Sequence, residues 1–130
     1  MQSASGADER DPLTARIIVA AIEVHRALGP GLLESVYERC LRRELERCGV
    51  AVSQQVPLPI VYRGEQLDAE IRIDLLVAGT VIVEVKSVER VHTIVEAQVL
   101  TYLKLSGLHT GLILNFNNVR LKDGIRRLVR

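Results

Sequence analysis

The stretch from Glu70 to Ser87, which reads EIRIDLLVAGTVIVEVKS, constrains the fold of this chain more than any other. Two apolar runs flank Ala78-Gly79-Thr80, a pattern that predicts a β-hairpin with glycine at the turn position that needs a positive φ. If Val77 pairs with Val81 across the turn, the register of the hairpin is fixed, because each further pair steps outward by one residue on both strands.

This register places four charged side chains at the open end of the hairpin. Asp74 falls opposite Glu84, and Arg72 falls opposite Lys86. Successive side chains of a strand point to opposite faces, so these four share one face while the other face is wholly apolar. Strands this apolar are normally covered on both sides, yet carboxylates are costly to bury unless they are paired or bind a metal. The conflict indicates a functional site at this end.

The remaining pattern predicts one α+β domain around a mixed sheet. At 130 residues the chain is long enough for one core, and its small, polar first ten residues are expected to form a disordered tail before a single domain over 11–130. Asp11-Pro12 is typical of a helix start. The expected helices cover 12–28, 32–48 and 93–106, and the expected strands cover 50–56, 58–62, the two arms of the hairpin, 109–116, 119–121 and 125–129.

Composition limits the classes of partner. The net charge is +1, so no overall field favours nucleic acid, and anion binding must come from local patches. No stretch is long and apolar enough to span a membrane, and Cys40 and Cys48, about 12 Å apart on one predicted helix, are too far apart to form a disulfide. We therefore expect a cytoplasmic protein. One basic patch lies near the end of the sequence and comprises Arg120, Lys122, Arg126, Arg127 and Arg130. It is either an anion-binding site or scattered surface charge, and the sequence leaves both interpretations open.

The charged end of the hairpin has two chemical interpretations. Asp74 and Glu84 can share Mg²⁺ or Mn²⁺, with the carbonyl of Val85 as a further oxygen ligand and Lys86 orienting the attacking water. Alternatively, the same side chains form a structural cross-strand salt-bridge cluster, with Arg72 as its fourth member. Spacing alone leaves both interpretations open.

Two motifs resemble those of a known superfamily. Asp74 followed by Glu84-Val85-Lys86 resembles the PD-(D/E)XK nuclease motif, although Ile73 stands at the variable position of the proline. GLLESVY, from Gly31 to Tyr37, matches the defining string of the GxxExxY protein family, a small bacterial branch assigned to that superfamily. The resemblance covers 13–129, including EAQVLTYLKLSG and LILNFN, and implies a restriction-endonuclease-like core, a mixed sheet flanked by helices.

The resemblance also implies roles for residues outside the hairpin. It makes Glu34 a further acidic ligand or water-positioning group, and Gln98, Tyr102 and Tyr37 contacts for the substrate. Each has a simpler alternative. Glu34 complements the dipole of its helix, Tyr37 and Tyr102 pack in the core, and Gln98 lies on the surface.

The resemblance implies a Mg²⁺-dependent nuclease that hydrolyses phosphodiester bonds in DNA or RNA. The alternative is a catalytically inactive binding or scaffold protein of the same fold, which the near-neutral charge and the few aromatic residues favour. Long apolar strands in a small domain also predict that one sheet edge is buried in a homodimer.

Overall fold

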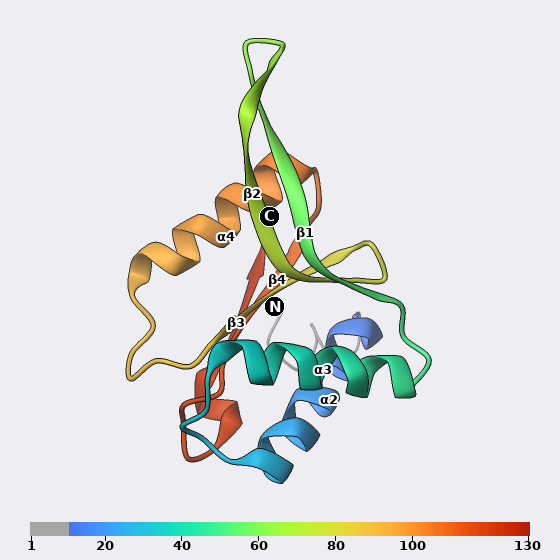
Figure 1. Ribbon diagram of the computed structural model, residues 1–130, viewed down its shortest axis with the longest axis vertical. Coiled ribbons are helices and arrows are strands. Elements are labelled where there is room, and N and C mark those ends of the chain that lie inside the picture. Colours follow the sequence, from blue (N-terminus) through green and yellow to red (C-terminus); the bar gives the residue numbers. More distant parts are fainter. Residues whose placement is uncertain (1–10) are drawn as a thin grey trace.

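The computed structural model describes residues 11–130, so the tail expected over 1–10 lies outside the described part (Figure 1). Within this described part, two helices are followed by three strands, and a third helix then separates them from the last two strands. In order they are α2 (Pro12–Leu28), α3 (Glu34–Arg47), β1 (Val52–Tyr62), β2 (Glu65–Val77), β3 (Val81–Lys86), α4 (Thr93–Ser106), β4 (Thr110–Asn115), the 3-10 helix η1 (Leu121–Gly124) and β5 (Ile125–Val129).

The five strands form one mixed sheet in the order β1-β2-β3-β4-β5. The pair β3 and β4 is parallel, with α4 as the crossover between them, and the other three pairs are antiparallel. The predicted α+β class is confirmed, and the architecture is consistent with the restriction-endonuclease-like core.

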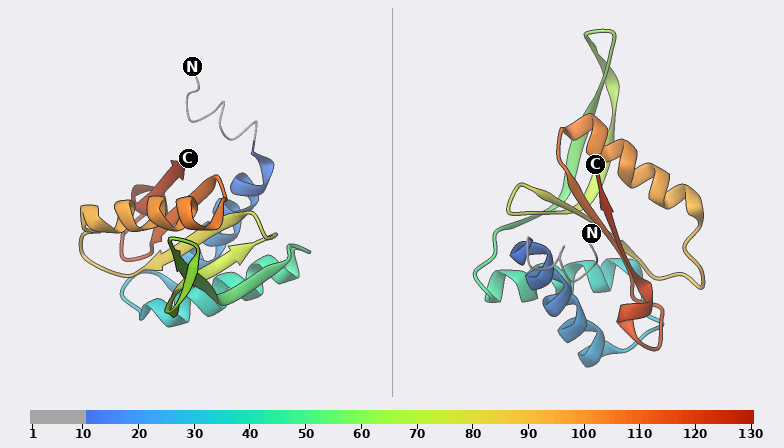
Figure 2. Two further views of the ribbon diagram at one scale, coloured as in Figure 1. Left: turned by 90° about the horizontal axis from the view of Figure 1, so that it is seen from above. Right: turned by 180° about the vertical axis from the view of Figure 1, so that it is seen from behind.

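Helices cover both faces of the sheet, as the apolar hairpin required (Figure 2). The main core joins α2 and α3 to one face, and its members include Ile17, Leu41, Val83 and Leu112. A smaller cluster joins α4 to the other face through Leu103, which packs with Ile73, Ile82 and the half-buried Leu58. The hairpin is therefore a central layer of the domain, with helices on both sides.

The predicted hairpin register is confirmed near the turn and wrong at the open end. Val77 pairs with Val81, and Gly79 has a φ of 69°. The ladder stops at Leu75 and Val83, however, because β2 then leaves β3. Arg72 consequently lies opposite Pro57 of β1 and not opposite Lys86.

Beyond this divergence, β1 and β2 continue as a two-stranded ribbon that projects from the body of the domain (Figure 1). The sequence predicted two strands separated by Pro57, but the structure has the single strand β1 there. β1 can include Pro57 because it is an edge strand, and an edge strand tolerates a missing amide donor. Ile73 leaves the apolar face expected of it and packs in the cluster beneath α4. Gln55, with a φ of 54°, lies in the gap between the pairs on either side of Asp74.

The end of the chain also differs from the prediction. The stretch 119–121 is not the expected strand, because η1 begins at Leu121 and leads directly into β5, which pairs with β4. Among the described residues, none of the helices is long and apolar enough to cross a membrane.

Candidate active site

The open end of the hairpin brings Asp74 and Glu84 together through two backbone hydrogen bonds. The amide of Asp74 donates to Glu84 Oε2 at 3.1 Å, and the amide of Val85 donates to Asp74 Oδ2 at 2.9 Å. Each carboxylate thus accepts a backbone N–H group from the neighbouring strand. Side chains replace the sheet ladder at the point where β2 and β3 separate.

Burial makes both carboxylates difficult to ionise. Glu84 is only 8% exposed, and desolvation, followed by repulsion from Asp74, raises its pKa from 4.5 to about 7. Desolvation also raises the pKa of Asp74, with a smaller contribution from repulsion by Glu38. Within residues 11–130, neither carboxylate forms an ion pair. The guanidinium of Arg72 instead pairs with Glu70 at 3.1 Å. The alternative prediction, a structural salt-bridge cluster that includes Arg72, is therefore wrong.

Glu38 of α3 is a third acidic residue at this site, and the sequence analysis missed it. It is 6% exposed, and its Oε2 accepts hydrogen bonds from Gln54 at 2.7 Å and Gln55 at 2.8 Å. The amide nitrogen of Gln55 also lies 3.4 Å from Asp74 Oδ1, so it bridges the two carboxylates. The available signal was helical spacing, since Glu38 follows Glu34 by four residues on the same face.

Lys86 and Tyr102 lie near the carboxylates. The positive charge of Lys86 partly offsets the rise in the pKa values of Asp74 and Glu84, although within the described chain it forms no ion pair. Burial, and then repulsion from Glu84 and Asp74, raises the pKa of Tyr102. Gln98 is exposed on α4, one turn before Tyr102. Its predicted contact with substrate stays a prediction.

The GLLESVY string forms a corner that holds the end of β3. The Tyr37 hydroxyl donates to the Gly29 carbonyl and accepts from the Leu32 amide at 3.1 Å. Glu34 Oε2 accepts from the amide of Ser87 at 3.2 Å, and the Ser87 hydroxyl donates to the Leu32 carbonyl. The chain segment directly after Lys86 is thereby fastened to the entrance of α3.

This geometry bears on two of the predicted site residues. Tyr37 is fully buried and its ring stacks on Phe116 with centroids 4.5 Å apart, so it packs in the core and presents no surface to a substrate. Glu34 binds the backbone of Ser87, whereas Glu38, one turn later, is the α3 carboxylate nearest Asp74 in the hydrogen-bond network.

Asn115 fixes the other side of the same segment. Its side chain accepts from the Val88 amide at 3.1 Å and donates to the Val88 carbonyl at 2.9 Å. The Phe116 amide also donates to the Lys86 carbonyl at 2.9 Å. The backbone on both sides of Ser87 is therefore held from β4 as well as from α3.

The chemistry of these donors suits a hard divalent cation. Asp74 and Glu84 are desolvated carboxylates on adjacent strands that form no ion pair within residues 11–130, and a cation bound to their oxygens would relieve their mutual repulsion. In the described part of the chain, no group of three or more histidine, cysteine, aspartate or glutamate side chains is arranged to hold a metal. Carboxylate oxygens fit Mg²⁺ or Mn²⁺, which keep several water ligands, better than structural Zn²⁺, which prefers cysteine and histidine.

Comparison with known proteins gives one match. The family model described as the PD-(D/E)XK nuclease superfamily matches residues 11–128. These residues include α2, α3, α4 and all five strands, except for Val129 at the end of β5. A search of curated proteins and a search of solved structures found no match.

Proposed function

Because the chain belongs to the PD-(D/E)XK nuclease superfamily, we propose that it hydrolyses phosphodiester bonds of DNA or RNA at Asp74, Glu84 and Lys86. The observation that carries the proposal is the pair of buried carboxylates at the split between β2 and β3. They lack an ion-pair partner among residues 11–130, and they adjoin a lysine that is also free of ion pairs there. Such costly burial is expected at a functional site.

Nucleases of this superfamily generally use divalent metals, and Asp74, Glu84 and the Val85 carbonyl would hold Mg²⁺ or Mn²⁺ here. When bound, the metal supplies charge stabilisation and activates water. The protein residues then have separate tasks. Asp74 and Glu84 would hold the cation at the open end of the hairpin, and Lys86 orients the attacking water and offsets the charge that develops on the phosphate.

Glu38 is added to the predicted site as a positioning residue. Gln55 donates to the carboxylates of both Glu38 and Asp74, so Glu38 helps to hold Asp74 Oδ1 in place through Gln55. The negative charge of Glu38 also strengthens the attraction of the site for a cation. Tyr102 and Gln98 lie on one face of α4, and we propose that they contact the substrate from that side.

We also propose that the chain belongs to the GxxExxY branch of the superfamily. The corner geometry supports this, because each motif residue contributes to one clamp. Gly31 has a φ of 96°, Glu34 binds the Ser87 amide, and Tyr37 binds the Gly29–Leu32 corner. The homodimer stays a proposal as well, and the sheet edge formed by β1 or β5 is its expected interface. Size measurement in solution tests it.

The test separates metal binding from hydrolysis. Mn²⁺ is titrated calorimetrically into the wild type, Asp74→Asn and Lys86→Met, and cleavage of labelled single-stranded DNA, duplex DNA and RNA is followed in parallel. We expect Asp74→Asn to lose both Mn²⁺ binding and cleavage. Lys86→Met is expected to keep Mn²⁺ binding and to lose about 100-fold or more in cleavage rate, since it removes only the group that orients water.

A matched control is Glu65→Gln, which removes an exposed carboxylate at the tip of the β1–β2 ribbon and should change neither readout. Cleavage that survives Asp74→Asn contradicts the proposed chemistry. Mn²⁺ binding without cleavage of any of the three polymers favours the alternative, an inactive binding or scaffold protein of this fold.

A further inference from the structure

The outer face of α3 carries a row of arginines beside the candidate active site. Arg39, Arg43 and Arg47 follow one another at intervals of four residues, so they share one face of the helix. On the side of α3 that faces β1 they border a groove of about 480 Å³, whose lining is Arg39, Arg42, Arg43, Glu46, Arg47 and Gln54.

The charge of this groove is mostly uncompensated. It contains four arginines and one glutamate, Glu46, whose carboxylate is bound to Arg42 Nε at 3.3 Å. Arg39, Arg43 and Arg47 are exposed, and within residues 11–130 they form no ion pair and no side-chain hydrogen bond. A chain with a net charge of only +1 therefore concentrates positive charge at one place.

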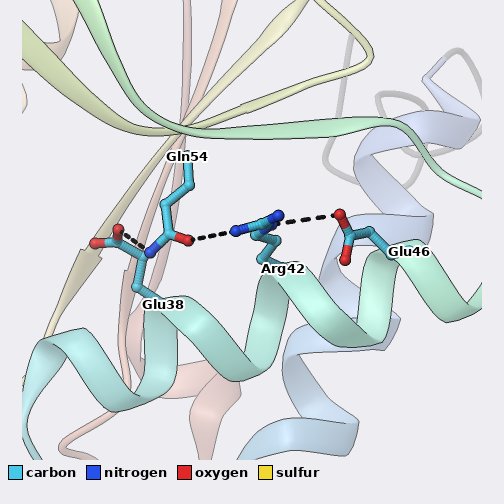
Figure 3. A network of polar contacts seen from close by, with 4 residues as sticks. All are labelled: Glu38, Arg42, Glu46 and Gln54. Carbon is cyan, nitrogen blue, oxygen red and sulfur yellow. Dashed lines mark hydrogen bonds and ion pairs between the residues drawn. The ribbon is translucent and has the colours of Figure 1, made fainter.

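Hydrogen bonds lead from the groove toward the carboxylates, and Figure 3 shows the first part of this series, from Arg42 through Gln54 to Glu38. Arg42 donates to Gln54 at 3.2 Å, and Gln54 donates to Glu38 at 2.7 Å. Glu38 in turn shares Gln55 with Asp74. Arg42 follows Glu38 by one turn, which is about 6 Å along the axis of α3. A strand whose phosphate lies at the carboxylates can therefore extend its next phosphates along the arginines.

We propose that Arg39, Arg42, Arg43 and Arg47, the arginine surface of α3, bind the phosphates that neighbour the reacting phosphate on a nucleic-acid strand. The inference rests on the proposed function and adds a binding surface to it. A guanidinium presents a rigid fork of donors that matches a phosphate. A row of them over two turns of helix fits a chain of anions better than a single anion.

Two other surfaces fit a strand less well. A groove of about 640 Å³ on the α2 side of the same arginines is also lined by Glu23, Glu44 and apolar side chains. The basic patch near the C-terminus loses two of its five charges to ion pairs, because Arg126 binds Glu96 at 2.8 Å and Arg127 binds Asp11 at 3.4 Å. On the β1 side of α3, by contrast, three arginines in a row on one helix face form no ion pair within residues 11–130.

The test measures binding without cleavage. Fluorescence anisotropy follows a labelled oligothymidylate strand, and a duplex of the same length, in EDTA at several salt concentrations. The triple variant Arg39→Gln/Arg43→Gln/Arg47→Gln leaves Arg42 and its contact with Gln54 intact. We expect its affinity to fall about 10- to 100-fold, and its salt dependence to fall by about 0.7 to 0.9 per arginine on the log–log slope.

The matched control removes the same charge elsewhere, as Arg120→Gln/Lys122→Gln/Arg130→Gln, and should retain wild-type affinity. Glu46→Gln should bind a few-fold more tightly, because it removes the carboxylate from the groove. Each of three results overturns the arginine surface: unchanged binding in the α3 variant, an equal loss in the control, or polyglutamate binding as strong as that of the oligonucleotide.

Failure of this inference is distinguishable from failure of the proposed hydrolysis. If Asp74→Asn abolishes cleavage while the α3 variant binds and cleaves as the wild type does, the hydrolase stands and the arginine surface is wrong. If the α3 variant loses binding while the wild type cleaves no polymer, the surface stands and the chain is a nucleic-acid-binding protein.

Discussion

The substitution Glu84→Gln tests the energetic cost of the buried carboxylate. Burial raises the pKa of Glu84 from 4.5 to about 7. Between these values the unfolded chain has lost the proton and the folded chain still holds it, so the free energy of unfolding falls as the pH rises. At about 1.4 kcal/mol per pKa unit, the ionised carboxylate costs the folded state about 3 kcal/mol above pH 7.

Glutamine removes this cost and retains an oxygen for the Asp74 amide, which Glu84 accepts at 3.1 Å in the wild type. We therefore expect the variant and the wild type to have similar free energies of unfolding near pH 4.5. At pH 8 the variant should be more stable by about 3 kcal/mol, which for a domain of this size corresponds to a melting temperature about 10 °C higher.

Urea unfolding in EDTA, followed by circular dichroism at several pH values between 4.5 and 8, measures the difference. Mg²⁺ added at pH 8 should stabilise the wild type more than the variant, because only the wild type has both carboxylates. Glu65→Gln, at the exposed tip of the ribbon, is the control whose difference from the wild type should not vary with pH. Parallel pH profiles of the wild type and Glu84→Gln would refute the reasoning.

Three further substitutions test the supports of the site, each by urea unfolding. Tyr37→Phe removes the hydroxyl that binds the Gly29 carbonyl and should cost about 1–2 kcal/mol, and an unchanged midpoint would contradict the corner clamp. Asn115→Ala leaves both polar groups of Val88 without their partner and should cost about 2 kcal/mol, with faster hydrogen exchange at the Val88 amide. Gly124→Ala places a Cβ atom 2.2 Å from the Asn115 carbonyl oxygen and should cost about 1–3 kcal/mol, so wild-type stability would refute that packing.

The fold was predictable where the pattern is local. Asp11 caps α2, with its carboxylate accepting from the Thr14 amide, and Pro12 is the first helical residue, as the sequence indicated. The pairing of Val77 with Val81 followed from the turn. The predictions that were wrong concern features that depend on the position of a strand in the sheet. Pro57 continues a strand because that strand is at an edge, which no local pattern reveals.

The candidate site was predictable to the same extent. The predicted hairpin placed Asp74, Glu84 and Lys86 together, and in the structure the Asp74 amide donates to the Glu84 carboxylate while the Val85 amide donates to the Asp74 carboxylate. Glu38 could not be distinguished from Glu34, because both lie on one face of α3 and only the docking of the helix decides which reaches Gln55.

The split between β2 and β3 and the candidate site have a common cause. Asp74 uses its carboxylate to accept the Val85 amide, so that amide is unavailable to the backbone of β2 and the ladder ends at Leu75. The departure of β2 also brings Gln55 of the ribbon to Glu38. Irregularity that costs stability is expected where a protein needs a site, which is why the strand pattern predicted this end of the hairpin least well.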